Sequence, residues 1–329
     1  MPKRHSGLLG LILKPMKNNF VTVLALVVLG LCTHISYGQQ DAQYTQYMYN
    51  PLSVNPAYAG SRDVLSIVGL YRSQWVGLDG APKTMNLSLH SPIGKKVGLG
   101  LNITRDEIFI SDETYIDLAF SYTLTISEKG RLALGLKGGG HLLNINSNKL
   151  NTGGFNSGDP DTQISIDNKF SPQIGAGAFY YTDKFYLGLS VPNFLETEHF
   201  DESSNSNNSS ATAEERVNYY LMTGYAFDVS DNLKFKPALL TKLVQGSPLQ
   251  VDLSANFLIH EKLTLGAAYR WSAALSGLVG FQVTDQIMIG FAYDRETTEL
   301  QQYNDGSYEV FLRFELFNRN EGLKNPRFF

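Results

Sequence analysis

The sequence contains a single cysteine, Cys32, and no cluster of basic residues. One cysteine rules out a framework of internal disulfides. The formal charge of the 329 residues is −4. It is −8 over residues 39–329, because four of the 27 Lys and Arg residues and none of the 31 Asp and Glu residues precede residue 39. A net negative chain without a basic patch is not expected to bind nucleic acid.

Long apolar runs are also scarce. The run near the N-terminus extends from Phe20 to Leu31, which is shorter than the roughly 20 residues that a transmembrane helix needs. Basic residues without acidic ones precede this run, and Ser36 and Gly38 follow it at the spacing of a cleavage site. This is the pattern of a secretory signal peptide. We therefore predict that residues 1–38 are a signal peptide, with Met16 as an alternative start codon.

Helical periodicity is absent after residue 40, and strand periodicity takes its place. Between Tyr115 and Ile126, bulky apolar residues alternate with small or polar ones, as in a strand with one apolar and one polar face. A sheet that spans lipid must close, because an open edge leaves backbone groups unpaired. We therefore predict an all-β fold: a transmembrane antiparallel β-barrel of about 14 strands over residues 63–318. The predicted strands are 64–75, 82–90, 96–106, 113–126, 131–144, 172–181, 184–191, 216–228, 232–243, 249–259, 262–271, 275–284, 287–296 and 306–317.

The connections between these strands alternate in length. Tight turns such as 127–130 and 182–184 follow even-numbered strands, whereas the long loops 145–171 and 192–215 follow the fifth and seventh strands. Outer-membrane barrels have short turns in the periplasm and longer loops outside. We therefore predict that both mature termini are periplasmic, with residues 319–329 as a C-terminal tail. A soluble β-sandwich is the alternative, although its turns would alternate less regularly.

The polar rows of the predicted strands indicate a polar interior. Many inward charges are incompatible with a packed apolar core, but they fit a lumen filled by water or by a plug. Glycines in the same rows would leave room for a close-packed plug. The inward polar residues are Asp117, Asp252, Asn256, Arg270, Glu309, Arg313 and Glu315, and the inward glycines are Gly98, Gly100, Gly135, Gly175 and Gly177.

Signals of enzymatic chemistry are missing. The histidines of the predicted mature chain are widely spaced and have no partners at metal-ligand spacing. There is no nucleophile elbow, and the glycines of 135–141 lie within a strand pattern rather than a phosphate-binding loop. We predict that the protein is not an enzyme and uses no cofactor or metal. A calcium site among Asp106, Glu107, Asp112 and Glu113 is an alternative to a solvated face.

Residues 39–62 fit neither helical nor strand periodicity. They are rich in tyrosine, and the steps Asn50-Pro51 and Asn55-Pro56 block a continuous strand. Irregular backbone is tolerated at membrane depth only inside the protein or beside water. We therefore predict a plug within the barrel or a periplasmic brace, with an unstructured linker as the alternative.

This segment and the first two predicted strands resemble the N-terminus of the PorP/SprF family of type IX secretion outer-membrane proteins of Bacteroidota. The similarity comprises a start rich in Gln and Tyr, an Asn-Pro-Ala-Tyr-Ala-Gly box, Arg-x-Gln-Trp, Pro-x-Thr, and the terminal Asn-Pro-Arg-Phe-Phe. We assign structural or partner-contact roles to the motif residues Tyr47, Asn50, Pro51, Asn55, Pro56, Ala57, Tyr58, Gly60, Arg72, Gln74, Trp75 and Pro82.

The resemblance implies a non-enzymatic barrel that binds a secreted adhesin, or another type IX cargo, through the cargo's C-terminal domain. Such a barrel helps to export or anchor the cargo, in some members for gliding motility, and its other partners would be further secretion components and outer-membrane lipids. A channel or transporter for small or hydrophobic compounds is the alternative. The loops 145–171 and 192–215 are candidates for partner contact, and the Ser- and Asn-rich second loop is equally suited to disorder without a partner.

Two motif residues leave alternatives open at this stage. Arg72 and Trp75 have opposite parity on the first predicted strand, so the pattern does not decide which of them faces inward. An inward Arg72 would pair with the N-terminal segment or with an inward carboxylate. Trp75 would otherwise belong to the aromatic girdle at the membrane interface.

Overall fold

The computed structural model describes residues 43–146, 166–195, 197–198 and 214–316. The predicted signal peptide, the predicted C-terminal tail and most of both long loops lie outside these residues. The chain divides into one unit of residues 39–245 and 249–329 and a second unit of residues 1–38 and 246–248. The barrel belongs to the first unit, and only a turn of the second falls within the described residues.

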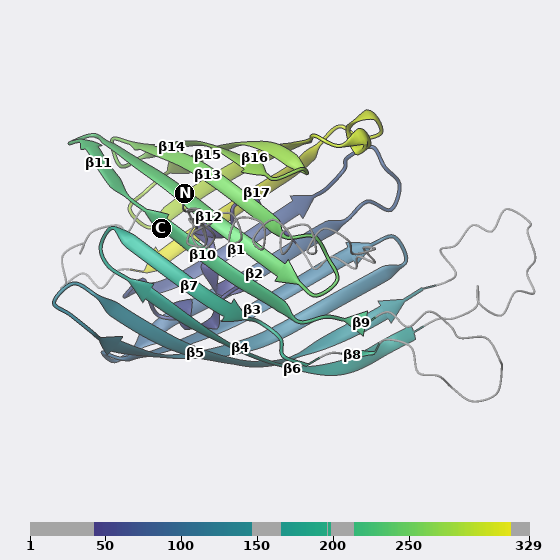
Figure 1. Cartoon of the computed structure of the whole chain (residues 1–329), viewed down its shortest axis with the longest axis horizontal. Helices are drawn as coiled ribbons and strands as arrows, with labels where there is room; N and C mark the ends of the chain where they lie inside the picture. The colour runs from purple at the N-terminus through teal and green to yellow at the C-terminus, as the bar shows by residue number, and fades with distance from the viewer. Residues whose placement is uncertain (1–42, 147–165, 196, 199–213, 317–329) are drawn as a thin grey trace, which may run out of the picture. The chain divides into compact units, whose positions relative to one another are not determined.

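Fourteen antiparallel strands form a closed barrel (Figure 1). Each strand pairs with the next along the chain, and β17 pairs with β1, which closes the sheet. The strands of the barrel are β1 (Leu65–Ser73), β2 (Lys83–Ile93), β3 (Val97–Ile108), β4 (Ser111–Thr125), β5 (Arg131–Ile145), β6 (Ile166–Tyr181), β7 (Phe185–Val191), β10 (Asn218–Tyr225) with β11 (Phe227–Ser230), β12 (Leu233–Val244), β13 (Gln250–Ile259), β14 (Leu263–Arg270), β15 (Ala274–Gln282), β16 (Ile287–Glu296) and β17 (Ser307–Leu316). Two short strands, β8 (Thr197–Glu198) and β9 (Glu214–Glu215), pair with each other only. The predicted all-β class and strand number are confirmed.

The eighth strand of the barrel departs from the prediction. It consists of two pieces, because β10 pairs with both β7 and β12 whereas β11 pairs with β12 alone. The register along β12 shifts between Asp228 and Ser230. A bulge of this kind inserts a residue and bends the strand, and it lies beyond the predicted strand end at residue 228. Within the predicted span 216–228 the strand is interrupted only at Ala226, and β10 and β11 pair with β12 in one register. The alternation of side chains does not reveal such an interruption.

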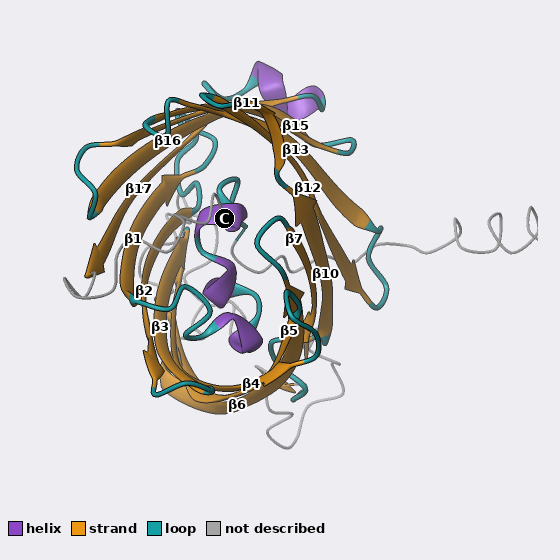
Figure 2. Cartoon of the chain, turned by 90° about the vertical axis from the view of Figure 1, so that its left-hand side faces the viewer, coloured by secondary structure: helices purple, strands orange, loops and turns teal. Residues whose placement is uncertain are grey.

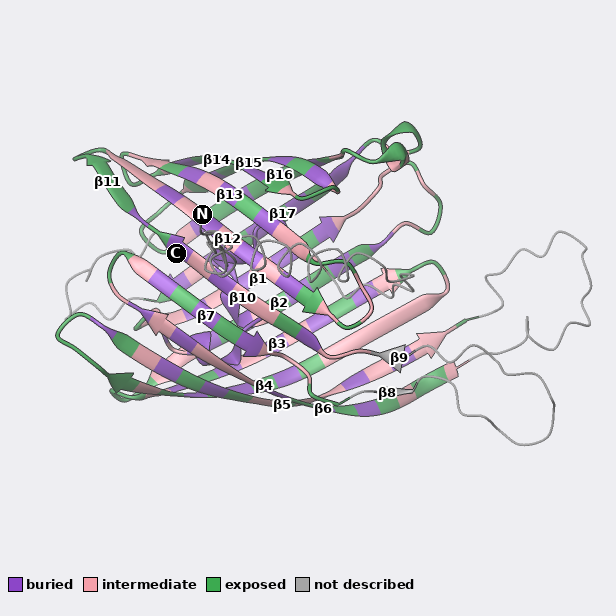
Figure 3. Cartoon of the chain, in the orientation of Figure 1, coloured by how far each residue is buried: buried purple, intermediate pink, exposed green. Residues whose placement is uncertain are grey.

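The two faces of the barrel invert the pattern of a soluble protein. On β4, Ile116, Leu118 and Phe120 are 45–64% exposed on the outer face, whereas Asp117 and Ser121 are buried on the inner face. The same alternation runs along the other strands of the barrel (Figure 3). An apolar outer face is what a lipid environment requires. The inward placement is confirmed for Asp117, Asp252, Asn256, Glu309, Arg313 and Glu315, all of which are buried, and for Arg270, which bonds to Asp252.

Residues 43–62, here called the lumenal segment, lie inside the ring of strands (Figure 2). The segment folds into three short 3-10 turns, η1 (Tyr47–Tyr49), η2 (Pro51–Ser53) and η3 (Pro56–Tyr58). Its apolar side chains form a core with residues of the wall such as Phe179 and Phe311. No helix in the described part of the chain is long and apolar enough to cross a bilayer.

The inward glycines of the wall mark where the lumenal segment approaches it. A Cβ atom added to Gly98, Gly135 or Gly177 would overlap backbone or side-chain atoms of the segment. A Cβ atom on Gly100 would press on Leu52 of the same segment. Gly175 differs, since its added Cβ atom would instead meet the Pro192 carbonyl after β7. Four of the five predicted glycines therefore make room for the segment.

Among the described connections, those longer than five residues lie at only one end of the barrel. One end, here called the turn end, carries the short connections 94–96, 126–130, 182–184, 231–232, 260–262 and 283–286. The other end, here called the loop end, carries 74–82, 109–110, 271–273 and 297–306, with η6 (Glu299–Gln302), as well as both long loops. This alternation agrees with the predicted topology. The assignment of the turn end to the periplasm stays a prediction.

Candidate functional site

The motif residues of the sequence gather mainly in the lumen. Eight of the twelve belong to the lumenal segment, and all of these except the half-buried Gly60 are buried. Arg72 faces the lumen from β1 and is 1% exposed. Gln74, Trp75 and Pro82 lie instead at the rim of the loop end. The candidate site is therefore the lumenal segment together with the side chains that fix it to the wall.

The two Asn-Pro steps give the segment its local structure. Pro51 and Pro56 are the first residues of η2 and η3, where their fixed φ suits the turn and their missing N–H costs no hydrogen bond. The Asn55 side chain caps η3 by accepting a hydrogen bond from the Ala57 N–H (3.0 Å). Each step thus ends one turn and begins the next.

The same asparagines anchor the segment to different parts of the wall. Asn50 Nδ2 donates to Asn86 Oδ1 (2.7 Å) and Ser88 Oγ (2.8 Å) on β2. Asn55 Nδ2 donates to the carbonyls of Ala178 on β6 (3.1 Å) and Leu189 on β7 (3.4 Å). Because a buried amide left without partners is costly, these bonds fix the orientation of the turns against the wall.

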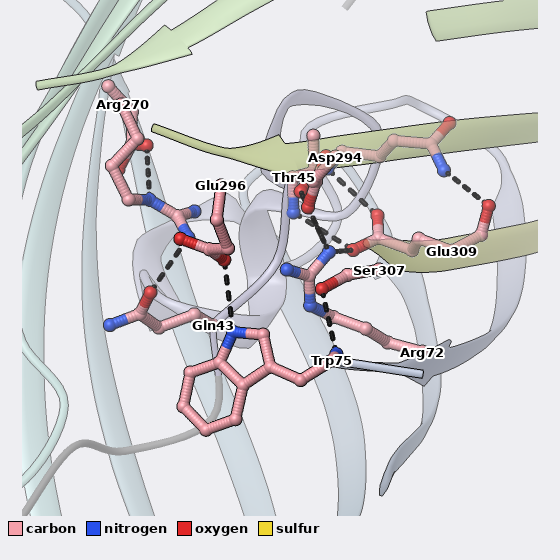
Figure 4. Close-up of polar contacts among 11 residues, drawn as sticks. Gln43, Thr45, Arg72, Trp75, Arg270, Asp294, Glu296, Ser307 and Glu309 are labelled. Carbon is pink, nitrogen blue, oxygen red and sulfur yellow. Dashed lines mark hydrogen bonds and ion pairs between the residues drawn. The ribbon is translucent and has the colours of Figure 1, made fainter. Parts of the chain in front are cut away.

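The start of the segment is fastened by a buried ionic cluster (Figure 4). Arg72 Nη1 lies 2.7 Å from Asp294 Oδ2 on β16 and 3.2 Å from Glu309 Oε2 on β17. It also donates to Thr45 Oγ1 (2.8 Å), which in turn donates to Asp294 (2.6 Å). The N–H groups of Thr45 and Gln46 donate to Glu309 (2.9 and 2.8 Å). Arg72 therefore contacts both an inward carboxylate and the N-terminal segment, and these five residues are here called the Arg72 cluster.

The end of the segment is fastened by a second buried pair. Arg62 contacts the Glu315 carboxylate through Nε and through Nη2 (3.2 Å). Burial by itself lowers the pKa of Arg62, but the Glu315 carboxylate and the Tyr58 hydroxyl more than offset this, and the pKa ends above its ordinary value. The Gly60 N–H donates to His90 Nδ1 (3.2 Å). Both ends of the segment are thus tied to the wall by an arginine and carboxylates.

The tyrosines of the segment contribute surface rather than charge. Burial raises the pKa of Tyr49 to about 12, although the Thr264 hydroxyl and the Arg313 guanidinium act to lower it. Burial likewise raises the pKa of Tyr44 and of Tyr47. The Tyr49 ring stacks on Phe311 with centroids 4.7 Å apart. At neutral pH these phenols are uncharged, and their rings pack against the inner wall.

The rim residues correct the predicted first strand. β1 ends at Ser73, so Gln74 and Trp75 lie in the connection to β2 and not on the strand. Trp75 has a φ of +45°, which a regular strand excludes. Its backbone N–H donates to Ser307 Oγ (3.1 Å) and its indole N–H to Glu296 Oε1 (3.0 Å), as Figure 4 shows. Trp75 therefore closes the rim between β1, β16 and β17.

The other two rim residues lie in the same connection. The Gln74 N–H donates to the Pro82 carbonyl (2.9 Å). This bond brings the start and the end of the connection between β1 and β2 together. Neither residue reaches the lumenal segment, so the motif is divided between the lumen and the rim.

Several anchoring residues were not singled out from the sequence. Asp294 lies in the inward row of β16, and Asn86 and Ser88 lie in the inward row of β2. The alternation of polar residues on these strands was a signal that could have found them. Thr45 and Gln46 carried no such signal, because their bonds to Glu309 use backbone N–H groups.

The chemistry that this site offers is attachment. Buried ion pairs, hydrogen bonds from side-chain amides and stacked aromatic rings hold the lumenal segment against strands that are distant in sequence. Among the described residues, no three His, Cys, Asp or Glu side chains gather in a way that could hold a metal ion.

The comparisons with known proteins concern family and fold. The family model of the type IX secretion system membrane protein PorP/SprF matches residues 36–314. No curated protein matches the chain. Solved structures with a similar fold include the CymD monoaromatic hydrocarbon channel, with 13% identity over 86% of this chain and 95% of that chain and a TM-score of 0.48. Others are the Acinetobacter baumannii outer membrane protein Omp33 (9% identity, 77% and 98% covered, TM-score 0.46) and a Pseudomonas aeruginosa FadL homologue (13% identity, 86% and 96% covered, TM-score 0.44).

Identities this low say nothing about a shared activity. The family match is of another kind, because it includes the lumenal segment and nearly all of the barrel. This chain, an outer-membrane β-barrel whose lumen encloses its own N-terminal segment, belongs to the PorP/SprF family of type IX secretion system membrane proteins.

Proposed function

We propose that this protein is a non-enzymatic outer-membrane component of the type IX secretion system. It binds a secreted adhesin, or another cargo of the system, through the C-terminal domain of that cargo, and helps to export the cargo or to anchor it at the surface. In a gliding bacterium, display of such an adhesin would serve motility. Other secretion components and the lipids of the outer membrane are its further partners.

The filled lumen is the main support for this proposal. The lumenal segment is tied to β1, β2, β6, β7, β16 and β17 by polar contacts. Arg62 at its end forms a buried ion pair with Glu315 of the wall, and Thr45 and Gln46 at its start are hydrogen-bonded to Arg72 and Glu309 of the wall. Removing one partner from such a buried pair costs several kcal/mol, roughly 3–5, so the segment is not displaced cheaply. A barrel of this kind acts through its surfaces rather than by conducting solutes.

Recognition of cargo is expected at the loop end. Connections between strands carry most binding functions in proteins built on a rigid scaffold. The described connections at this end, 74–82 and 297–306, are joined through the Val76 N–H and the Gly306 carbonyl (2.9 Å). They provide a fixed rim at the loop end, so a partner would meet an ordered surface there.

Deletion of the gene tests the proposed function directly. We expect one or a few large proteins to disappear from the cell surface while the other cargo of the system persists. An unchanged surface proteome would contradict the proposal.

Conductance measurements separate a scaffold from a channel. The purified protein in planar bilayers is expected to be nearly silent, because the lumenal segment fills the lumen. Steady conductance or ligand-dependent flux would instead favour a channel or transporter for small or hydrophobic compounds. A lipase or protease activity that is lost on replacing a single Ser or Asp would overturn the non-enzymatic assignment.

A further inference from the structure

A pocket of about 90 Å³ lies between the lumenal segment and the barrel wall. The segment contributes Tyr44, Ser53 and Val54 to its lining, and the wall contributes residues of β3, β4, β5, β6 and β10 and of the connection after β7. Asn193 lies two residues after the end of β7 and Asn218 begins β10, so both lie at the loop end. The pocket is therefore on the side of the segment that is nearer the loop end.

Most of the residues that line this pocket are of polar types, although most of the surface that they expose to it is apolar, and the lining has no net charge. Its only charged residues are Asp117 and Lys137, which form a largely buried pair with Lys137 Nζ 2.8 Å from Asp117 Oδ2. The remaining residues are tyrosines, amides, hydroxyl residues, a valine and a proline. A charged group entering this pocket would lose its hydration without gaining a free counter-charge. The pocket suits an uncharged ligand group that combines apolar contact with a few hydrogen bonds.

The size of the pocket limits the ligand further. A cavity of about 150 Å³ holds one benzene molecule, so a pocket of about 90 Å³ is too small to enclose an aromatic or sugar ring. It has room for a small side chain. Tyrosine with Asn and Ser is also the combination by which antibody combining sites recognise polypeptides, because the rings give rigid amphipathic contact and the short polar groups adapt their hydrogen bonds.

We infer, on the basis of the proposed function, that this pocket receives one uncharged polar side chain (Asn, Gln, Ser or Thr) from an extended part of the bound cargo. The lumenal segment forms part of the floor of the pocket, since Tyr44 and Ser53 belong to it. Tyr44 directly precedes Thr45 of the Arg72 cluster, and its hydroxyl lies 3.5 Å from Thr104 Oγ1 on β3. The pocket exists only while the segment is docked. Cargo that binds there consequently stabilises the docked segment.

A variant that fills the pocket tests this inference. Ser53 is half-buried at the pocket and its hydroxyl bonds only to the Asn50 carbonyl (2.8 Å), so Ser53→Phe adds bulk without removing a contact to the wall. Thr297→Phe, at an exposed rim position away from the pocket, is the matched control. Each variant is expressed in a strain that lacks the chromosomal gene. Quantitative surface proteomics then compares the strains, with barrel level and heat-modifiability on gels recorded.

The two hypotheses fail in different ways in this experiment. We expect Ser53→Phe to reduce the dependent surface protein at least about ten-fold, the effect of losing one well-buried anchor, and Thr297→Phe to restore it fully. If the deletion strain keeps all of its surface proteins, the proposed function itself fails. If deletion strips a protein that Ser53→Phe restores as well as the wild type does, only the pocket is refuted.

A cross-link provides a second measurement that does not require bulk in the lumen. Cys32 is the only natural cysteine, so in a Cys32→Ser background Asn193→Cys carries a unique thiol at the pocket for a maleimide benzophenone probe. We expect a light-dependent cross-link to the protein that the deletion strain loses. A cross-link from Thr297→Cys but none from Asn193→Cys would overturn the inference.

Discussion

The lumenal segment and the wall of strands around it reach a fixed conformation in different ways. The wall repeats an alternation of exposed outward and buried inward residues along most of its strands, so its structure depends on many equivalent positions. The segment has no repeat. It depends on a few individual contacts, such as Thr45 with Arg72 and Asn55 with the Leu189 carbonyl. A single substitution should therefore be tolerated on the outer wall and be damaging where the segment is anchored.

The largest effect is expected from Arg72→Ala. It leaves the buried carboxylates of Asp294 and Glu309 side by side without their cation, and removal of one partner from a buried ion pair costs about 3–5 kcal/mol. The free energy of unfolding in urea should fall by this amount, and protease should cleave residues 43–62. Arg105→Ala, which breaks a surface pair with Asp112 on a half-exposed arginine, should have little effect. Equal effects of the two variants would refute the distinction between lumen and surface.

A smaller effect is expected from Gly135→Ala. The added methyl group meets the backbone of Ala57, and overpacking of this kind typically costs about 1–3 kcal/mol. Gly138→Ala is the matched control on the same strand, because a Cβ atom there has no neighbour within 4 Å. Proteolysis followed by mass spectrometry should detect exposure of the segment in the first variant only. Wild-type resistance of the Gly135→Ala barrel would contradict close packing at this point.

Asn55→Ala should cost about 1–2 kcal/mol, since it removes both the cap of η3 and the bonds to the wall. The lower end of this range corresponds to loss of the cap alone. The measurement is again the urea midpoint. If the midpoint stays unchanged, the second Asn-Pro step is not an anchor.

The weakest effect is expected from high pH. The pKa of Tyr49 is raised by burial from its ordinary value of 10 to about 12. The folded state therefore retains a proton that the unfolded state loses, and this contribution to stability is complete below pH 10 and is lost as the pH rises toward about 12. We expect stability to decline over that interval, and less so in Tyr49→Phe. A near-ultraviolet titration in which Tyr49 ionises at its ordinary pKa would contradict its burial.

Much of the barrel could be predicted because the face of the sheet on which a residue lies depends only on its neighbours in the sequence. Alternation with period two assigns each residue to a face, and it correctly predicted Asp117, Glu309 and Arg313 as inward. Strand ends were less predictable: the β1 ladder stops at Ser73, and the left-handed backbone of Trp75 follows from its bonds to other strands. The break between β10 and β11 had no sequence signal for the same reason.

The site was predictable only in part. The Asn-Pro steps and the tyrosines mark residues 43–62 as irregular, and the wall glycines indicate a close-packed plug. The particular partners could not be derived, because Thr45 and Gln46 bond to Glu309 across more than 260 residues of sequence through backbone groups that every residue carries. The pattern of apolar and polar residues does not specify which distant residues form such hydrogen bonds.

The sequence by itself determined the class of this protein, since alternation, turn spacing and the N-terminal motif specify a closed β-barrel of one family. Only the tertiary structure decided that Arg72 faces the lumen, that Trp75 belongs to the rim, and that Tyr44 and Ser53 border a neutral pocket. The physical reason is that face and period are properties of neighbouring residues. A buried ion pair or a pocket forms only when closure of the barrel brings distant strands together around the lumenal segment.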